Sequence, residues 1–242
     1  MTAKKSYMSL RAIGAIVVLT TLSACHSDDE DDEIVVEPPV VVAPVPYSYE
    51  VTVTNLTNAQ PLSPVAVALH QEGTFWTVGE SASQALEEMA EGGDNSALLE
   101  SANVLAQASG SAPIGAGGSE TIAVTINDVN DAKLTVATML VNTNDAFTGV
   151  NGWDLSTLEV GASMTAYTHV YDAGTEANSE AQGSIPGPAD SGEGFNAARD
   201  DVDFVAMHPG VVSIDDGLTN SVLHAEHKFD NPVTMITVTR VE

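Results

Sequence analysis

Apolar and polar residues alternate along six segments of the chain, which is the period of a strand with one buried face. Threonine and valine dominate these segments, and both are favoured at half-buried β-positions. The predicted strands are residues 47–56, 64–70, 120–127, 133–142, 163–171 and 232–241.

Between the second and third predicted strands the spacing becomes helical. In residues 81–93, Ser81 or Ser83 can cap a helix whose apolar residues recur three and four positions apart. Gly92 and Gly93 would end this helix, because glycine readily adopts the left-handed conformation of a helix C-cap.

Residues 95–109 repeat the helical signature and predict a second short helix. Residues 177–201 are rich in glycine, proline, serine and acidic residues, which predicts a long loop. We therefore expect a mainly β protein, an antiparallel β-sandwich with a short helical insertion.

The N-terminus has the features of a secretory signal peptide. Lys4, Lys5 and Arg11 precede the apolar run AIGAIVVLTTL, which is short for a membrane-spanning helix. The run ends in LSAC, which resembles the lipobox of bacterial lipoproteins and implies cleavage after residue 24 and lipidation of Cys25. The alternative is an ordinary signal peptide with an incidental cysteine.

Cys25 is the only cysteine, so the exported chain has no disulfide and depends on core packing. Several acyl chains on this residue would anchor it stably to a membrane. Because His26 rather than aspartate follows the cysteine, we favour the outer membrane or the cell surface.

Charge excludes one class of partner. Without residues 1–24, four basic residues remain against 34 acidic ones, a formal charge of −30. A field of this sign repels nucleic acid and anionic lipid and attracts cations. It does not by itself specify a binding site.

The chain divides into a linker and one large domain. Residues 25–46 begin with the acidic run HSDDEDDE and continue as IVVEPPVVVAPVP, in which repeated proline favours an extended spacer. We expect a disordered stalk there, and a single β-sandwich domain over residues 47–242.

The segment HVYDAGTEANSE contains the most informative acidic pair. Asp172 and Glu176 lie four residues apart across Gly174. A turn there could direct both carboxylates at one cation, since calcium prefers six to eight oxygen ligands from loops. An ordinary solvated turn, capped by Asp172, is the other interpretation that the spacing leaves open.

Two motifs resemble the spondin domain, the N-terminal module of the F-spondin and mindin extracellular-matrix proteins. They are NDAFTGVNGWDL and YDAGTEANSE, in the order in which the family has its two corresponding loops. The segments VTVTNLTNAQPLSPVAVALH and HKFDNPVTMITVTRV extend the similarity over most of residues 47–242. The resemblance implies a β-sandwich with a calcium ion at one end, held by Asp145, Asp172 and Glu176. Glu176 stands where the animal members have aspartate.

The histidines offer a different chemistry, because imidazole suits zinc and copper. His70, His208 and His224 could form a metal-dependent hydrolytic or carbohydrate-active site, and His169 and His227 are further candidates. No HExxH or GxSxG motif is present. Two tryptophans could stack on sugars or simply belong to the core, Trp76 and Trp153.

The sequence thus favours a lipid-anchored adhesion or binding module outside the cytoplasm, with a structural calcium site and no catalytic function. Its partner would be a protein or a polysaccharide, and not nucleic acid. The alternatives are the histidine-based enzyme and a structural envelope protein without a specific ligand.

Overall fold

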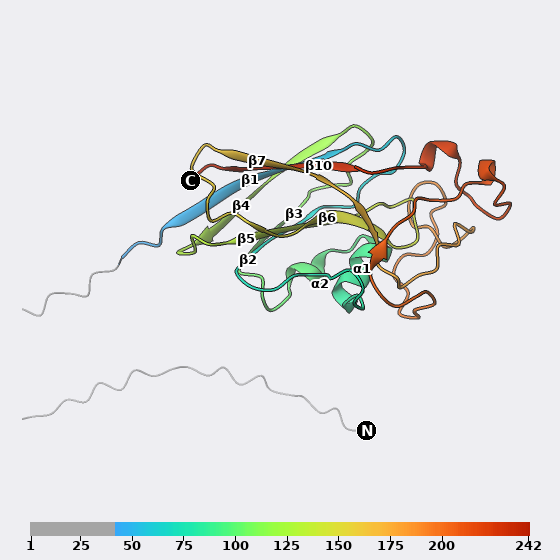
Figure 1. Ribbon diagram of the computed structural model, residues 1–242, viewed down its shortest axis with the longest axis horizontal. Helices are drawn as coiled ribbons and strands as arrows, with labels where there is room; N and C mark the ends of the chain where they lie inside the picture. Colours follow the sequence, from blue (N-terminus) through green and yellow to red (C-terminus); the bar gives the residue numbers. More distant parts are fainter. Residues whose placement is uncertain (1–41) are drawn as a thin grey trace, which may run out of the picture. The chain divides into compact units, whose positions relative to one another are not determined.

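A computed structural model describes residues 42–242, which form an antiparallel β-sandwich with a small helical insertion (Figure 1). The fold class predicted from the alternation is therefore confirmed. No helix within this range is long and apolar enough to cross a membrane. The expected signal peptide, Cys25 and residues 25–41 of the expected stalk lie outside the described residues.

One sheet has four strands in the order β4-β1-β10-β7, and all neighbours are antiparallel. Its central strand β1 alternates buried and solvent-facing residues, as the sequence predicted. The strands are β1 (Pro46–Asn55), β4 (Ser119–Asn127), β7 (Ser163–Thr168) and β10 (Thr234–Arg240).

The second sheet has six strands in the order β3-β2-β5-β6-β8-β9. Its central strands β2 and β5 are buried almost throughout, because both of their faces are covered. The strands are β2 (Ala66–His70), β3 (Ala106–Ser109), β5 (Lys133–Met139), β6 (Ala146–Asp154), β8 (Val170–Asp172) and β9 (Ala206–Met207).

Two apolar cores cover these faces. The main core lies between the sheets and includes Val51, Leu134 and Val238. The second core lies where α1 (Gln84–Gly92) and α2 (Ser96–Leu99) cover the outer face of the six-stranded sheet. Two short 3-10 turns occur later in the chain, η1 (Ile214–Asp216) and η2 (Ala225–His227).

The first predicted helix is confirmed, and Ser83 rather than Ser81 is its N-cap. The Ser83 hydroxyl accepts a 3.2 Å hydrogen bond from the amide of Leu86, which satisfies one of the free amides of the first turn. Gly93 ends the helix at φ +70°. Leu86 and Met89 of this helix are fully buried.

The prediction of a helix over residues 95–109 is wrong for most of its length. Helix α2 ends at Leu99, and residues 106–109 form β3, which pairs with β2. Pairing with an edge of the sheet satisfies the backbone of this segment, and it overrides a helical propensity that is weak without tertiary contacts.

The predicted strand 163–171 is two strands in different sheets. Thr168 pairs with Thr234 in the four-stranded sheet, whereas Val170 pairs with Thr148 in the six-stranded sheet. The chain therefore crosses between the layers at His169. Residues 177–201 contain no helix or named strand, as predicted for a loop.

Candidate functional site

Strand pairing places the predicted calcium ligands at one end of the six-stranded sheet. Asp145 immediately precedes β6, and Asp172 is the last residue of β8. Ala146 and Asp172 are in register between these strands, and Glu176 follows in the turn after β8. The structure thus brings Asp145, Asp172 and Glu176 to the same place.

The Asp145 side chain is completely buried, and only one of its two carboxylate oxygens accepts hydrogen bonds. Its Oδ2 accepts hydrogen bonds from the amides of Thr175 and Glu176, at 2.9 and 3.2 Å, and from the Thr175 hydroxyl at 3.3 Å. Its Oδ1 has no hydrogen-bond partner in the described part of the chain. Burial and the neighbouring Asp172 raise the pKa of Asp145 to about 7, although the two amides favour its charged form.

Asp172 differs from Asp145 because both of its oxygens are occupied. Its Oδ1 accepts from the amide of Gly174 at 2.8 Å, and its Oδ2 accepts from the side-chain amide of Asn178 at 2.6 Å. An aspartate that accepts from the amide two residues later stabilises a tight turn. Asp172 therefore shapes the loop that carries Glu176.

Gly174 is required in this turn for two reasons. Its φ is +72°, and a Cβ atom there would lie 2.2 Å from the carbonyl oxygen of Phe204. The left-handed conformation alone costs roughly 1–2 kcal/mol for a residue with a side chain. The contact adds to this cost because it involves the main-chain oxygen of Phe204, which no side-chain rotation can move.

We expect Gly174→Ala to lower the free energy of unfolding by about 3 kcal/mol or more, through strain and overpacking. Gly161→Ala is the matched control, since Gly161 has φ +83° and open space around its Cα. Gly161→Ala should lose only the free energy that the left-handed backbone conformation costs. Urea unfolding of both variants measures the difference, and equal losses would show that the contact with Phe204 is unimportant.

Glu176 is half-buried and lies among other acids. Its Oε1 accepts a 2.8 Å hydrogen bond from the side-chain amide of Asn144. Burial raises the pKa of Glu176 to about 7, and the nearby carboxylates Glu91, Asp200 and Glu193 act in the same direction. Deprotonation at this position is therefore unfavourable without a compensating cation.

Glu91 of α1 belongs to this group, although it was not among the residues predicted from the sequence. It is 1 % exposed. Its Oε2 accepts from the amide of Asn196 at 2.9 Å, while no partner within residues 42–242 reaches its Oε1. Burial raises its pKa. Glu87 and Glu91 lie four residues apart beside the apolar face of the helix, so they share one side of it. This spacing was the feature of the sequence that could have identified Glu91 as a site residue.

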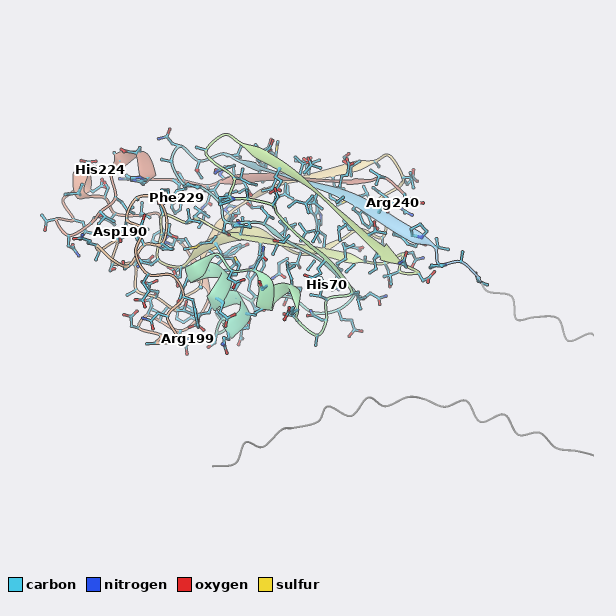
Figure 2. The ribbon with its side chains drawn as sticks, turned by 180° about the vertical axis from the view of Figure 1, so that it is seen from behind. His70, Asp190, Arg199, His224, Phe229 and Arg240 are labelled. Atoms are coloured by element: carbon cyan, nitrogen blue, oxygen red, sulfur yellow. The ribbon has the colours of Figure 1, made fainter. Side chains whose placement is uncertain are left out.

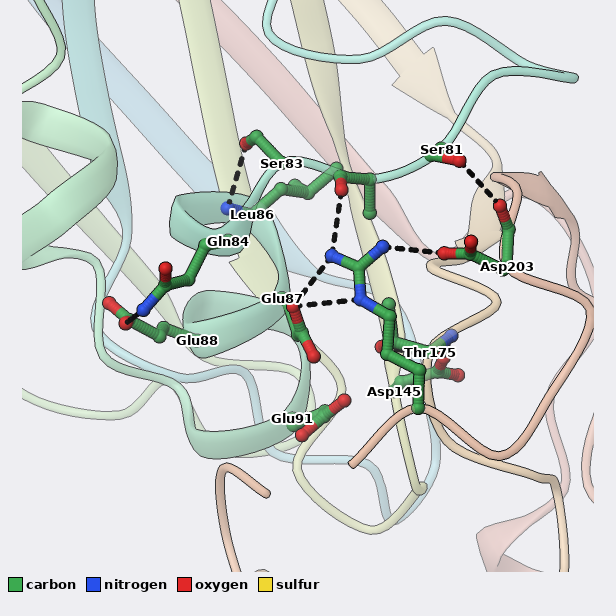
Figure 3. Close-up of polar contacts among 12 residues, drawn as sticks. Ser81, Ser83, Gln84, Leu86, Glu87, Glu88, Glu91, Asp145, Thr175 and Asp203 are labelled. Carbon is green, nitrogen blue, oxygen red and sulfur yellow. Dashed lines mark hydrogen bonds and ion pairs between the residues drawn. The ribbon is translucent and has the colours of Figure 1, made fainter. Parts of the chain in front are cut away.

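Arg199 supplies the positive charge at the edge of the group. Its Nε and Nη2 donate to Glu87 Oε2 at 3.0 and 2.6 Å, and its Nη1 donates to Asp203 at 2.5 Å (Figure 3). We use the name acidic cluster for five residues, Glu87, Glu91, Asp145, Asp172 and Glu176. Among them Arg199 neutralises only Glu87.

The oxygens of the acidic cluster are not already gathered around a point. Within residues 42–242, no three His, Cys, Asp or Glu side chains form a group arranged to hold a metal ion. Each carboxylate is instead held by its own donors. A bound cation would have to compete with these hydrogen bonds, or use the oxygens that lack them.

The structure does not bring together the histidines of the alternative site. His70 is buried at the end of β2, with Nε2 2.8 Å from the Thr135 hydroxyl, and it lies far from exposed His224 (Figure 2). His208 is buried between the side chain of Asn178 and the amide of Gly210, and burial lowers its pKa to about 4. These contacts are those of isolated hydrogen-bonding histidines.

The two tryptophans have packing roles, and the two remaining histidines lie outside the acidic cluster. Trp76 is buried and makes an edge-to-face contact with Phe147, at 5.2 Å between ring centroids. Trp153 is half-buried against the main core. The exposed His169 lies at the crossing between the sheets, and His227 accepts from the amide of His224 at 2.9 Å in a short turn.

Comparison with known proteins adds no family assignment. No protein-family model matches the chain, and no curated protein is similar to it.

Proposed function

We propose that this protein is an exported, lipid-anchored adhesion or binding module whose spondin-like sandwich binds one structural calcium ion at the acidic cluster. The observation that carries the calcium site is the buried carboxylate of Asp145, whose Oδ1 meets no donor of the described chain. Burying a carboxylate without compensation is costly, and a cation provides that compensation.

The partner-free oxygens favour a particular division of roles. Glu87, Glu91 and Asp145 each have a buried oxygen that accepts no hydrogen bond, but Arg199 already neutralises Glu87. Asp145 and Glu91 therefore remain for a cation, and Glu176 is the third carboxylate beside them. We assign the ion to these three side chains. Asp172, whose two oxygens are occupied, supports the site by fixing the turn.

The chemistry of the donors favours calcium over transition metals. The acidic cluster contains only carboxylates, and hard oxygen ligands suit calcium, whereas zinc and copper favour imidazole and thiolate. An ion held here would connect α1, the start of β6 and the turn after β8. It would offset the repulsion among their carboxylates and order the loops at this end of the sandwich as a binding surface.

Export, lipidation and adhesion are proposed on the sequence alone. The basic and apolar N-terminus with its LSAC motif supports lipid anchoring at Cys25, and the stalk would hold the domain away from the membrane. The spondin resemblance supports binding to a protein or a polysaccharide. The formal charge of −27 argues against nucleic acid.

Thermal unfolding of the chelator-treated protein, with calcium, magnesium or zinc added back, tests the site. We expect a calcium-selective rise in melting temperature, because a ligand of the folded state stabilises it by about 2.7 kcal/mol at a hundredfold excess over its Kd. Asp145→Asn and Glu91→Gln should abolish this rise, and Asp172→Asn should weaken it.

Asp131→Asn is the matched control, since Asp131 is an exposed carboxylate that accepts from the side chain of Gln71 and lies outside the acidic cluster. It should respond to calcium like the unchanged protein. No response to calcium, or a rise with zinc alone, would reject the calcium site. An equal calcium response in Glu91→Gln would remove Glu91 from it.

A further inference from the structure

Strand β7 is a long open sheet edge in the described part of the chain. It pairs with β10 on one side, and no strand pairs with it on the other. The other end strands are short or carry a charge. Strands β3 and β9 have four and two residues, and β4 carries Glu120, which accepts from the amide and hydroxyl of Ser111 at 2.7 Å.

This edge lacks the usual protection against strand pairing. Natural sheets protect their edges with charges, prolines or bulges. The sequence of β7, SMTAYT, has no charge and no proline, and its register with β10 is regular over its length. An uncharged edge is notable in a chain with 34 acidic residues.

Open space lies along the same edge. A cleft of about 500 Å³ separates β7 from the second half of β6. Strand β6 pairs with β8 only at residues 146–148. Its residues 149–154 pair with β5 on one side and face this cleft on the other. The free backbone groups of β7 are therefore accessible within the described fold.

The outer face of the sheet carries a row of threonines that ends at this edge. Thr121, Thr52, Thr237 and Thr165 are in register across its four strands. Their hydroxyls hydrogen-bond in pairs, at 2.8 Å for Thr52 with Thr121 and 2.9 Å for Thr165 with Thr237. Beside Thr165, the Tyr167 side chain is 61 % exposed.

We propose that β7 is a homodimer contact, in which two copies pair their β7 strands antiparallel about a two-fold axis and join their four-stranded sheets. Pairing centred on Thr165 places it opposite Thr165 of the partner subunit and Ser163 opposite the partner's Tyr167. This register keeps outward-facing side chains on one face, as a strand pair requires.

The strand suits a second copy of this chain better than an unrelated strand. An isologous contact needs a self-complementary surface, and the outward face of β7 meets this need with three hydroxyl side chains, Ser163, Thr165 and Tyr167. The row of threonines continues across the contact. Two acidic copies repel each other, so their closest approach is favoured where the strand itself carries no charge.

Cysteine cross-linking tests the pairing directly. Thr165→Cys is introduced into the full chain carrying Cys25→Ser, so that it provides the only thiol. Opposed residues of an antiparallel pair lie roughly 4.5–5.5 Å apart, which is within reach of a disulfide. We expect a disulfide-linked dimer under mild oxidation. Thr121→Cys, in the same row at the opposite edge, should form no disulfide-linked dimer, although its β7 contact is unchanged.

Sedimentation of the Cys25→Ser chain provides an independent readout. We expect a dimer that tightens at high salt, where self-repulsion is screened. Tyr167→Asp should shift it to monomer by adding a charge to the edge, and the control Ala123→Asp on exposed β4 should not. A monomer at every concentration and salt, equal cross-linking of the two cysteines, or a dimer unaffected by Tyr167→Asp would each overturn the proposal.

Discussion

The calcium-free protein is expected to lose stability as the pH rises from about 4 to about 7. Burial raises the pKa of both Asp145 and Glu176 to about 7, whereas such groups titrate near 4 in an unfolded chain. Between these values the folded state binds more protons than the unfolded state, so the free energy of unfolding falls as the pH rises. The loss is on the order of a few kcal/mol, at about 1.4 kcal/mol per pKa unit.

Saturating calcium is expected to remove most of this loss. The ion binds the deprotonated carboxylates, so its affinity should increase up to about pH 7 and then level off. Urea unfolding at a series of pH values, with chelator or with calcium, measures both effects. Asp145→Asn should reduce the loss of stability with pH in chelator, where Glu176 still contributes, and should abolish the gain from calcium. The control Asp131→Asn should change neither.

His208 affects the pH dependence of stability in the opposite direction to the carboxylates. It therefore determines the pH range in which urea unfolding tests the carboxylates best. Its pKa is lowered to about 4, so the unfolded state binds its proton more readily, and stability falls as the pH decreases below about 6.5. Near pH 7 the two carboxylates outweigh His208, because their folded-state pKa values lie at this pH and the histidine of the unfolded chain is already mostly deprotonated. Calcium-free stability that rises between pH 6.5 and 7.5 would contradict the assignment.

Much of the sandwich could be predicted because its strands have one buried face. The alternation of valine and threonine identified β1, β4 and β10 closely. Strand β6 was missed, because its sequence AFTGVNGWD has two glycines and no clean alternation, and because both faces of its first half are covered. The division of residues 163–171 at His169 depends on which sheet each half joins, and no local pattern contains that information.

The candidate site, too, could be predicted only where its residues belong to local sequence motifs. Asp145, Asp172 and Glu176 could be named from two motifs that also predicted their neighbourhood. Glu91 comes from a helix more than fifty positions earlier in the chain, and it joins the acidic cluster only because α1 covers the outer face of the sheet. The role of Asp172 followed from its hydrogen bonds, which spacing alone could not provide.

Arg199→Met is expected to lower the free energy of unfolding by about 3 kcal/mol. The change removes both donors to Glu87 Oε2 and leaves a carboxylate whose side chain is only 5 % exposed. Breaking a buried ion pair from one side costs roughly 3–5 kcal/mol. The 26 % exposure of Arg199 places our expectation at the lower end of that range.

A control and a double variant separate the charge from the side chain itself. Arg240→Met removes an arginine that donates to the backbone carbonyls of Glu242 and Leu158 and pairs with no buried acid among residues 42–242, so it should cost less. Glu87→Met combined with Arg199→Met should recover most of the loss, because no unpaired charge is then buried. A double variant as unstable as Arg199→Met alone would attribute the effect to lost packing.

Arg199→Met also separates the role of the Arg199 guanidinium from that of the proposed calcium ion. Arg199 neutralises Glu87, whereas the partner-free oxygens assigned to calcium belong to Asp145 and Glu91. Arg199 pairs directly with Glu87, and its charge acts on Glu91 more weakly than the Asn196 amide does. Arg199→Met should therefore still gain stability from calcium, by an amount similar to that of the unchanged protein. Loss of the calcium response, measured by thermal unfolding, would instead make the guanidinium a necessary support of the ion site.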